Sequence, residues 1–215
     1  MYWLNFEQLG TIIFACPIGI AMVSLWNNND ILKGTTMNIF WLHDNPYVNA
    51  RYHCDKHIKK MVLETAQMLS TAVHMVGAPT SKVYKKAYVN HPCTVWARES
   101  FANFIELWQL GMALGEEWSY RYGRKDKETH NSYEVIKGMD LETIGDKFSQ
   151  HTSLAFNWVT VNGSTTKPQC MPDEYKTTDT IEAYRNYYIG DKVLDKGIVD
   201  YSRGRSVPEF LQGVL

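Results

Sequence analysis

The stretch from Tyr52 to Leu69 most constrains the fold, because its apolar residues recur at helical spacing. At about 100° per residue, they fall within about 60° of one direction, and the pattern continues past the stretch. The members of this stripe are Ile58, Met61, Val62, Thr65, Leu69, Ala72 and Val73. Cys54 lies on the same side, as a small buried residue would. The pattern predicts a long amphipathic helix that ends at Gly77 and Pro79.

Two further segments show helical patterns. In "NHPCTVWARES", Asn90 or His91 can cap a helix and Pro92 suits its first turn, and the pattern then runs to Gly123. Its apolar positions are Ala97, Phe101, Phe104, Ile105, Trp108, Met112 and Gly115. "TIEAYRNYYIGDK" resumes a helical pattern to Gly190, whereas "LAFNWVTVNG" suits a strand or a loop. With 215 residues and 45% hydrophobic content, the chain is expected to form a mainly α, compact single domain with irregular segments and a short strand pair.

The first 36 residues differ from the rest. Their apolar run, from Thr11 to Trp26, is shorter than the roughly 20 residues that a membrane-spanning helix needs, and Pro17 and Gly19 interrupt it. A secretory signal has basic residues before its apolar run, and none precedes this one. We expect residues 1–36 to be a leader or a spurious extension, with a genuine N-terminal extension as the alternative. Residues 37–215 then form one helical catalytic domain without a membrane segment.

Charge and cysteine content narrow the setting. The net charge is −1, so attraction to an anionic partner must come from local basic clusters such as "RYHCDKHIKK", "SKVYKK" and "YRYGRKDK". The four cysteines have wide, irregular spacings that do not resemble a disulfide framework or a paired zinc motif. These features favour a reducing cytoplasm.

A polar stripe flanks the core face of the first predicted helix. His53, His57 and Glu64 fall within about 40° of one another on a continuous helix. In one interpretation they are boundary residues, and Glu64 pairs with Lys60 one turn away. In a second, His53 and His57 bind zinc, with His91 and Cys93 as further ligands. In a third, Glu64 is a general acid or base that acts on nucleic acid.

Three blocks of the chain from Met37 onward resemble the phage pyrimidine-dimer DNA glycosylases. "DKHIKKMVLE" resembles the family's Asp-x-His followed seven residues later by its catalytic glutamate. "NHPCTVW" with "NFIELWQLGMALGEEWSYRYG" resembles its central helix, and "AYRNYYIGDK" resembles its aromatic C-terminal tail. The family's enzymes are helical, cut the glycosidic bond at ultraviolet-damaged pyrimidines and then nick the backbone. The blocks keep the family's order along the chain.

The resemblance implies a mechanism that needs neither cofactor nor metal. In that family, the α-amine exposed by removal of the first methionine attacks the sugar C1′ and forms an imine, and the glutamate assists sugar opening and elimination. By position, Asn38 carries the amine, Glu64 is the glutamate and His57 is the neighbouring histidine. The residues expected to contact DNA are Arg51, Lys56, Lys60, His91, Arg98, Tyr184, Arg185, Tyr187 and Tyr188.

Two features depart from the family. Its second residue is threonine followed by arginine, whereas Asn38 and Ile39 follow Met37 here. Family members are also clearly basic. The sequence predicts a monomeric, phage-encoded enzyme. It would bind double-stranded DNA in the cytoplasm of the infected bacterium. The alternatives are a phage enzyme that modifies or hydrolyses another base or nucleoside, with or without zinc, and a nucleic-acid-binding protein without catalysis.

Overall fold

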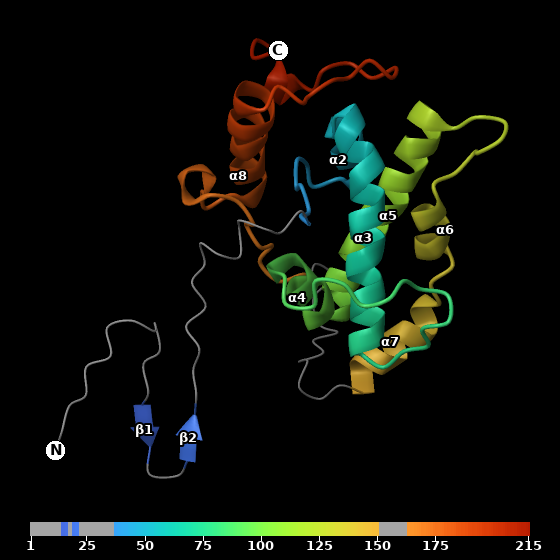
Figure 1. Ribbon diagram of the computed structural model, residues 1–215, viewed down its shortest axis with the longest axis vertical. Coiled ribbons are helices and arrows are strands. Elements are labelled where there is room, and N and C mark those ends of the chain that lie inside the picture. Colours follow the sequence, from blue (N-terminus) through green and yellow to red (C-terminus); the bar gives the residue numbers. More distant parts are fainter. Residues whose placement is uncertain (1–13, 17–18, 22–36, 151–162) are drawn as a thin grey trace. The chain divides into compact units, whose positions relative to one another are not determined.

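The computed structural model describes residues 14–16, 19–21, 37–150 and 163–215, and the chain divides into two units at Thr36 and Met37 (Figure 1). In the first unit, β1 (Phe14–Cys16) pairs antiparallel with β2 (Gly19–Ala21), and Ala15 lies opposite Ile20. Most of "LAFNWVTVNG" lies outside the described residues.

The second unit is mainly α, as the sequence predicts. Its α-helices are α2 (Pro46–Tyr52), α3 (Asp55–Met75), α4 (Pro92–Glu99), α5 (Phe101–Tyr122), α6 (Asn131–Lys137), α7 (Leu141–Gln150) and α8 (Thr180–Tyr187). Two short 3-10 helices, η1 (Asp173–Tyr175) and η3 (Glu209–Leu211), and a π-helical segment, η2 (Tyr188–Asp195), complete it. Among the described residues, no helix is both long enough and apolar enough to cross a membrane.

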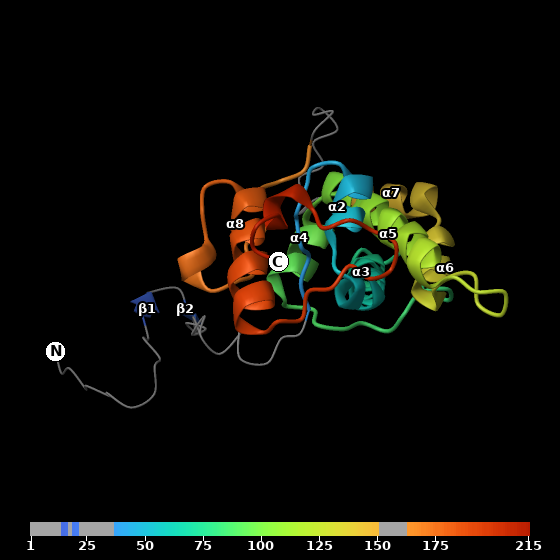
Figure 2. The ribbon, with the colours of Figure 1, turned by 90° about the horizontal axis from the view of Figure 1, so that it is seen from above.

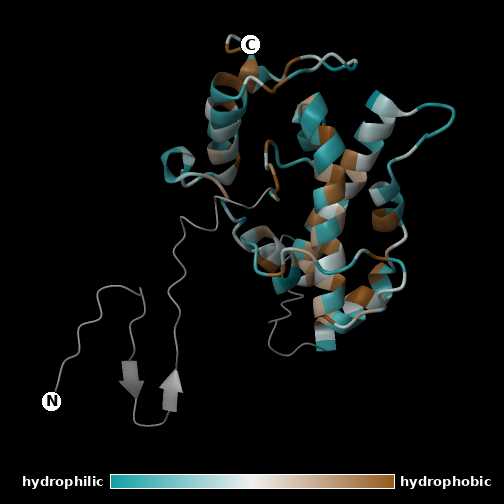
Figure 3. Ribbon diagram, viewed as in Figure 1, coloured by the Kyte–Doolittle hydropathy of each residue, from teal (hydrophilic) through white to brown (hydrophobic). Residues whose placement is uncertain are grey.

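Helix α3 lies at the centre of this unit. It packs against α4, α5 and α6, and α2 packs against α5 (Figures 1 and 2). Apolar and polar residues both line α3, as an amphipathic helix requires (Figure 3). The predicted stripe is confirmed, since all seven of its residues and Cys54 are buried. This stripe anchors the core on which the polar residues of α3 are positioned.

The predicted helix ends are largely confirmed. His91 is the N-cap of α4 and its ring accepts the Cys93 N–H, and Pro92 follows in the first turn. Gly123 ends α5, and Gly77 has a φ of 74° just after α3. The long helix predicted from Pro92 is instead two helices, because Ser100 is extended and its hydroxyl caps α5 through Asn103 N–H.

The predicted continuous helix through His53 and His57 is wrong. Helix α2 ends at Tyr52 and α3 begins at Asp55, and the backbone of His53 and Cys54 between them is extended, with ψ of 135° and 165°. His53 therefore does not share a helical stripe with His57 and Glu64.

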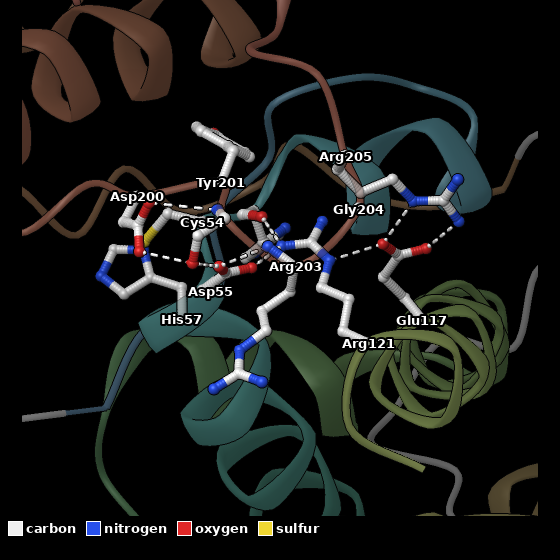
Figure 4. Close-up of polar contacts among 12 residues, drawn as sticks. Cys54, Asp55, His57, Glu117, Arg121, Asp200, Tyr201, Arg203, Gly204 and Arg205 are labelled. Carbon is white, nitrogen blue, oxygen red and sulfur yellow. Dashed lines mark hydrogen bonds and ion pairs between the residues drawn. The ribbon is translucent and has the colours of Figure 1, made fainter.

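A buried arginine holds this break in place (Figure 4). Arg121 of α5 donates to the carbonyl oxygens of His53 at 2.8 Å and of Arg51 at 2.9 Å. Its guanidinium also pairs with Asp55 at 2.9 Å and with Glu117 at 2.7 Å. Because α2 has just ended and α3 is just beginning, these carbonyls lack helical partners, and Arg121 supplies them.

The same carboxylates bind the C-terminal segment. Asp55 accepts hydrogen bonds from the Ser202 hydroxyl and the Arg203 N–H, and Arg205 binds both oxygens of Glu117 at 2.7 and 2.8 Å (Figure 4). Burial alone would raise the pKa of Glu117, but hydrogen bonds from Arg205 and Arg121 outweigh it and lower the pKa. Glu117 therefore contributes stability above the ordinary glutamate pKa and loses it as the pH falls through the lowered value.

We predict that Arg121→Met destabilises the protein by about 3–5 kcal/mol, because it leaves two buried carboxylates without their shared cation. The measurement is urea unfolding followed by circular dichroism. The matched control is Arg124→Met, whose exposed pair with Asp126 spans 3.5 Å and which should change stability by less than about 0.5 kcal/mol. Equal stabilities of the two variants would contradict the role given to Arg121.

Candidate functional site

Glu64 lies on α3 with only 5% of its surface exposed. One carboxylate oxygen accepts the backbone N–H of Asn38 at 2.9 Å, and the other pairs with Lys60 at 3.0 Å. The predicted Lys60–Glu64 pair is thus present, but it is not a surface pair, because Glu64 is buried and also binds a second segment.

Burial raises the pKa of Glu64, although Lys60 and the Asn38 N–H act in the opposite direction. A carboxyl group with a raised pKa holds a proton more readily near neutral pH. This is the property that a residue needs if it both gives and takes protons during a reaction. Glu64 is accordingly suited to acid–base chemistry.

Asn38 is fixed at both of its polar ends. Its side-chain oxygen accepts from the Tyr184 hydroxyl at 2.9 Å, and its side-chain nitrogen donates to the Cys170 carbonyl at 2.9 Å. Its backbone nitrogen faces Glu64. Met37 before it is buried, and its sulfur accepts a hydrogen bond from Thr94. The structure thus brings predicted site residues Asn38 and Glu64 into direct contact.

His57 is a buried neutral imidazole. It stacks on Phe40 with ring centroids 4.8 Å apart, and its Nδ1 forms a 2.9 Å hydrogen bond with the Tyr188 hydroxyl. Burial lowers the pKa of His57 well below its ordinary value, and the positive charges of three lysines act in the same direction. His57 is therefore held in position rather than free to bind an anion as a cation.

Those three lysines lie near His57 and come from two elements. Lys60 belongs to α3, Lys192 belongs to η2, and Lys196 directly follows η2. Lys192 pairs with Asp191 at 2.6 Å and donates to the Tyr187 hydroxyl at 3.0 Å. Lys196 pairs with the same Asp191. Three lysines thus bring positive charge close to His57, and two of them, Lys60 and Lys192, also act on Glu64. Lys192 and Lys196 were not predicted as site residues, although "AYRNYYIGDK" contains Lys192.

The prediction that Tyr184 and Tyr188 contact DNA is wrong for this structure. Both rings are fully buried, and their hydroxyls bind inside the protein, to Asn38 and to the Cys54 N–H respectively. Tyr187 is different, because it is only partly buried and stacks on Phe40 at 6.1 Å. Of the three tyrosines, Tyr187 alone is not fully buried.

The remaining predicted DNA-contact residues do not form one cluster of free charges. Arg51 and Lys56 are exposed. Arg185 donates to the Leu42 carbonyl at 2.9 Å, and Arg98 donates to the Val89 carbonyl, so both bind backbone. His91 is buried as the cap of α4.

The zinc set His53, His57, His91 and Cys93 is not assembled. Among the described residues, the group whose ligand atoms lie within 4.8 Å of one another is His91, Cys93 and Cys170. His53 instead binds the Asn49 carbonyl at 2.8 Å through Nδ1. Cys170 was missed because 77 residues separate it from Cys93, and it falls in a proline-containing loop without periodic pattern.

A surface depression of about 370 Å³ lies elsewhere, between the 164–167 segment and the start of α8. Its lining includes Asp44, Thr165, Lys167 and Asp179, and none of the predicted site residues. The Glu64 region combines a buried carboxylate, the Asn38 N–H that it accepts and a lysine that pairs with it, an arrangement that the lining of the depression lacks.

Comparisons with family models, curated proteins and solved structures returned no match to this chain.

We predict that His53 and His57 stay neutral in the folded protein when the pH falls from 7.5 to 5. Burial lowers the pKa of His53 to about 4 and that of His57 well below 6.5. The measurement is the NMR shift of the imidazole carbon-bound protons during titration. In the urea-unfolded chain, the same protons should titrate near about 6.5.

Because both pKa values are lowered on folding, the stability they contribute is present above about pH 6.5 and decreases as the pH falls below it. Titration of either ring near its ordinary value in the folded protein would contradict the burial described here.

Proposed function

We propose that this protein is a DNA glycosylase with AP-lyase activity that acts on ultraviolet-damaged pyrimidines. The observation that carries the proposal is the 2.9 Å contact between the Glu64 carboxylate and the backbone nitrogen of Asn38. In the family that the sequence blocks resemble, the α-amine and the glutamate act on the same sugar, so the two groups must lie close together. No helical stripe or local pattern joins these two residues, because 26 positions separate them.

The nucleophile in this proposal is the α-amine of Asn38, which forms when Met37 and all residues before it are removed. A free α-amine has a pKa near about 7.7–8.0, so a useful fraction is neutral at physiological pH. Its nitrogen forms a bond to C1′ while the bond from C1′ to the damaged base breaks, and the base leaves with a proton. Opening of the sugar gives the imine, and loss of the C2′ proton then expels the 3′ phosphate.

Glu64 is the residue that moves protons in this scheme. Its raised pKa suits donation during sugar opening, and its ionised form suits removal of the C2′ proton. Lys60 pairs with the Glu64 oxygen that does not accept the Asn38 N–H, and about half of the Lys60 side chain is exposed. A DNA phosphate can therefore draw Lys60 away and open a path to Glu64.

His57 and Tyr188 are positioning residues in the same proposal. The Tyr188 hydroxyl joins His57 to the Cys54 N–H at the start of α3, and Phe40 packs on the other side of the imidazole. Phe40 follows Asn38 by two residues, so this packing fixes the path of the chain that carries the nucleophile. Lys192, Lys196 and the partly buried Tyr187 are the closest candidates for contacts to double-stranded DNA. A monomer in the bacterial cytoplasm is the setting that we propose.

Removal of Met37 also vacates the volume that its buried side chain fills beside Thr94. Loss of a buried methionine side chain costs about 2–5 kcal/mol of stability. The new space adjoins the Asn38 amine, where the sugar must enter. The proposal therefore links exposure of the nucleophile to the opening of its site.

The test is borohydride trapping on irradiated duplex DNA with a protein whose first residue is Asn38. Borohydride reduces an imine to a permanent amine, so we expect a covalent protein–DNA band that survives a chelator. The matched control begins at Met37 and should give no band, because its amine is one residue farther from Glu64. Strand cleavage that a chelator abolishes, with no trapped band, would overturn the amine mechanism.

We predict that Glu64→Gln in the Asn38-start protein lowers turnover by at least about 100-fold, because it removes a proton-transfer group while keeping the side-chain volume. DNA binding should remain within a few-fold. The matched control is Glu116→Gln, since Glu116 is exposed on α5, and it should keep full activity. Binding without cleavage in every variant would favour the alternative of a non-catalytic DNA-binding protein, and full activity of Glu64→Gln would remove Glu64 from the mechanism.

A further inference from the structure

The thiols of Cys93 and Cys170 meet inside the second unit. Their sulfur atoms are 3.4 Å apart, and both cysteines are free thiols. Cys93 is in the first turn of α4 and is fully buried, whereas Cys170 lies in the irregular segment before η1. Neither the proposed DNA chemistry nor the arginine network uses this pair.

A third donor completes the cluster. A ring nitrogen of His91, the cap of α4, lies within 4.8 Å of both sulfur atoms. A neutral imidazole has one ring nitrogen whose lone pair can bind a metal. His91 Nδ1 accepts the Cys93 N–H at 3.2 Å, a distance at the long end for a hydrogen bond.

We propose that His91, Cys93 and Cys170 bind one Zn²⁺ ion. Two thiolates on tetrahedral zinc, with Zn–S bonds of about 2.3 Å, lie about 3.8 Å apart. The observed sulfur separation of 3.4 Å needs only a small expansion to reach that value. Two thiolates and an imidazole are also the donors that zinc prefers.

The charges of the cluster suit a divalent cation, because a thiol that coordinates zinc gives up its proton. The two thiolates would balance the 2+ charge of the ion, which makes burial of the cluster electrostatically acceptable.

A water molecule is the expected fourth ligand. Cys93 Sγ donates to Asn38 Oδ1 at 3.8 Å, and that oxygen also accepts hydrogen bonds from the Tyr184 hydroxyl and the Ile39 N–H. Once the Cys93 thiol gives up its proton to bind zinc, the other two donors still occupy both lone pairs of the oxygen, so it is not counted as a metal ligand. The ion would join α4 to the segment around Cys170, and Asn38 donates to the carbonyl of that same Cys170.

A disulfide between the same cysteines would use the two sulfur atoms alone and would give His91 no part. The convergence of a third, neutral donor on the thiol pair is the reason that we assign the site to a metal. The assignment does not depend on the proposed DNA chemistry.

The test uses the full chain, purified under reducing conditions, supplied with Zn²⁺ and freed of loosely bound metal. Elemental analysis should find about one zinc per chain. Replacement by Co²⁺ should give the thiolate-to-cobalt charge-transfer absorption of a tetrahedral site. We expect Cys93→Ser and Cys170→Ser to lose both signals.

The matched control is Cys54→Ser, because Cys54 is a buried free cysteine outside the cluster and should keep both signals. Circular dichroism of each variant separates loss of metal from loss of fold, and Cys170→Ser is the milder change because Cys170 is only partly buried. A chelator should lower the melting temperature of the wild-type chain and leave that of Cys170→Ser unchanged.

A wild-type chain that retains no zinc, or that shows no charge-transfer absorption with cobalt, overturns the proposal. So does a thiol count showing that Cys93 and Cys170 form a reducible disulfide when zinc is present. Retention of zinc by both cluster variants would also place the metal elsewhere. These readouts do not involve DNA cleavage, so they stand or fall separately from the glycosylase proposal.

Discussion

The buried guanidinium of Arg121 is the interaction on which the arrangement of the second unit depends. It binds the carbonyls of Arg51 and His53 at the end of α2 and the carboxylate of Asp55 at the start of α3. It also pairs with Glu117, which in turn binds Arg205 of the C-terminal segment. Each of these groups would be costly to bury alone, and together they satisfy one another. The direction in which α3 leaves α2 is thereby set by a residue on α5.

That direction decides which polar residues of α3 meet other segments. With the break at His53 and Cys54, the Cys54 N–H turns to the Tyr188 hydroxyl, and the same hydroxyl binds His57. One and two turns farther on, Lys60 and Glu64 follow, and Glu64 receives the backbone nitrogen of Asn38. The candidate site is therefore built on the rigid central helix, whereas its partner Asn38 comes from the extended segment before α2.

The parts of this arrangement that could be predicted from the sequence are those that local physics decides. The stripe of α3, the cap at His91 and the stop at Gly123 depend on spacing and backbone preference within a few residues. The break at His53 could not be predicted, because its cause is Arg121, 68 positions away. The burial of Tyr184 and Tyr188 could not be predicted for a similar reason. The groups that bind their hydroxyls belong to Asn38 and Cys54, which are remote in sequence. Cys170 likewise becomes a partner of Cys93 only in the folded chain.

Asn38 connects the two candidate chemistries of the molecule. Its backbone nitrogen is held by Glu64, and its side-chain amide is held by the Cys170 carbonyl and the Tyr184 hydroxyl. A metal that fixes Cys170 to α4 would therefore also fix the amide side of Asn38, without contacting its backbone nitrogen. In such an arrangement the cation acts as a positioning group, and the proton-transfer group is Glu64. Since preorganised geometry lowers the entropic cost of reaching a reactive conformation, a structural ion at this point favours an ordered nucleophile even though it takes no part in bond making.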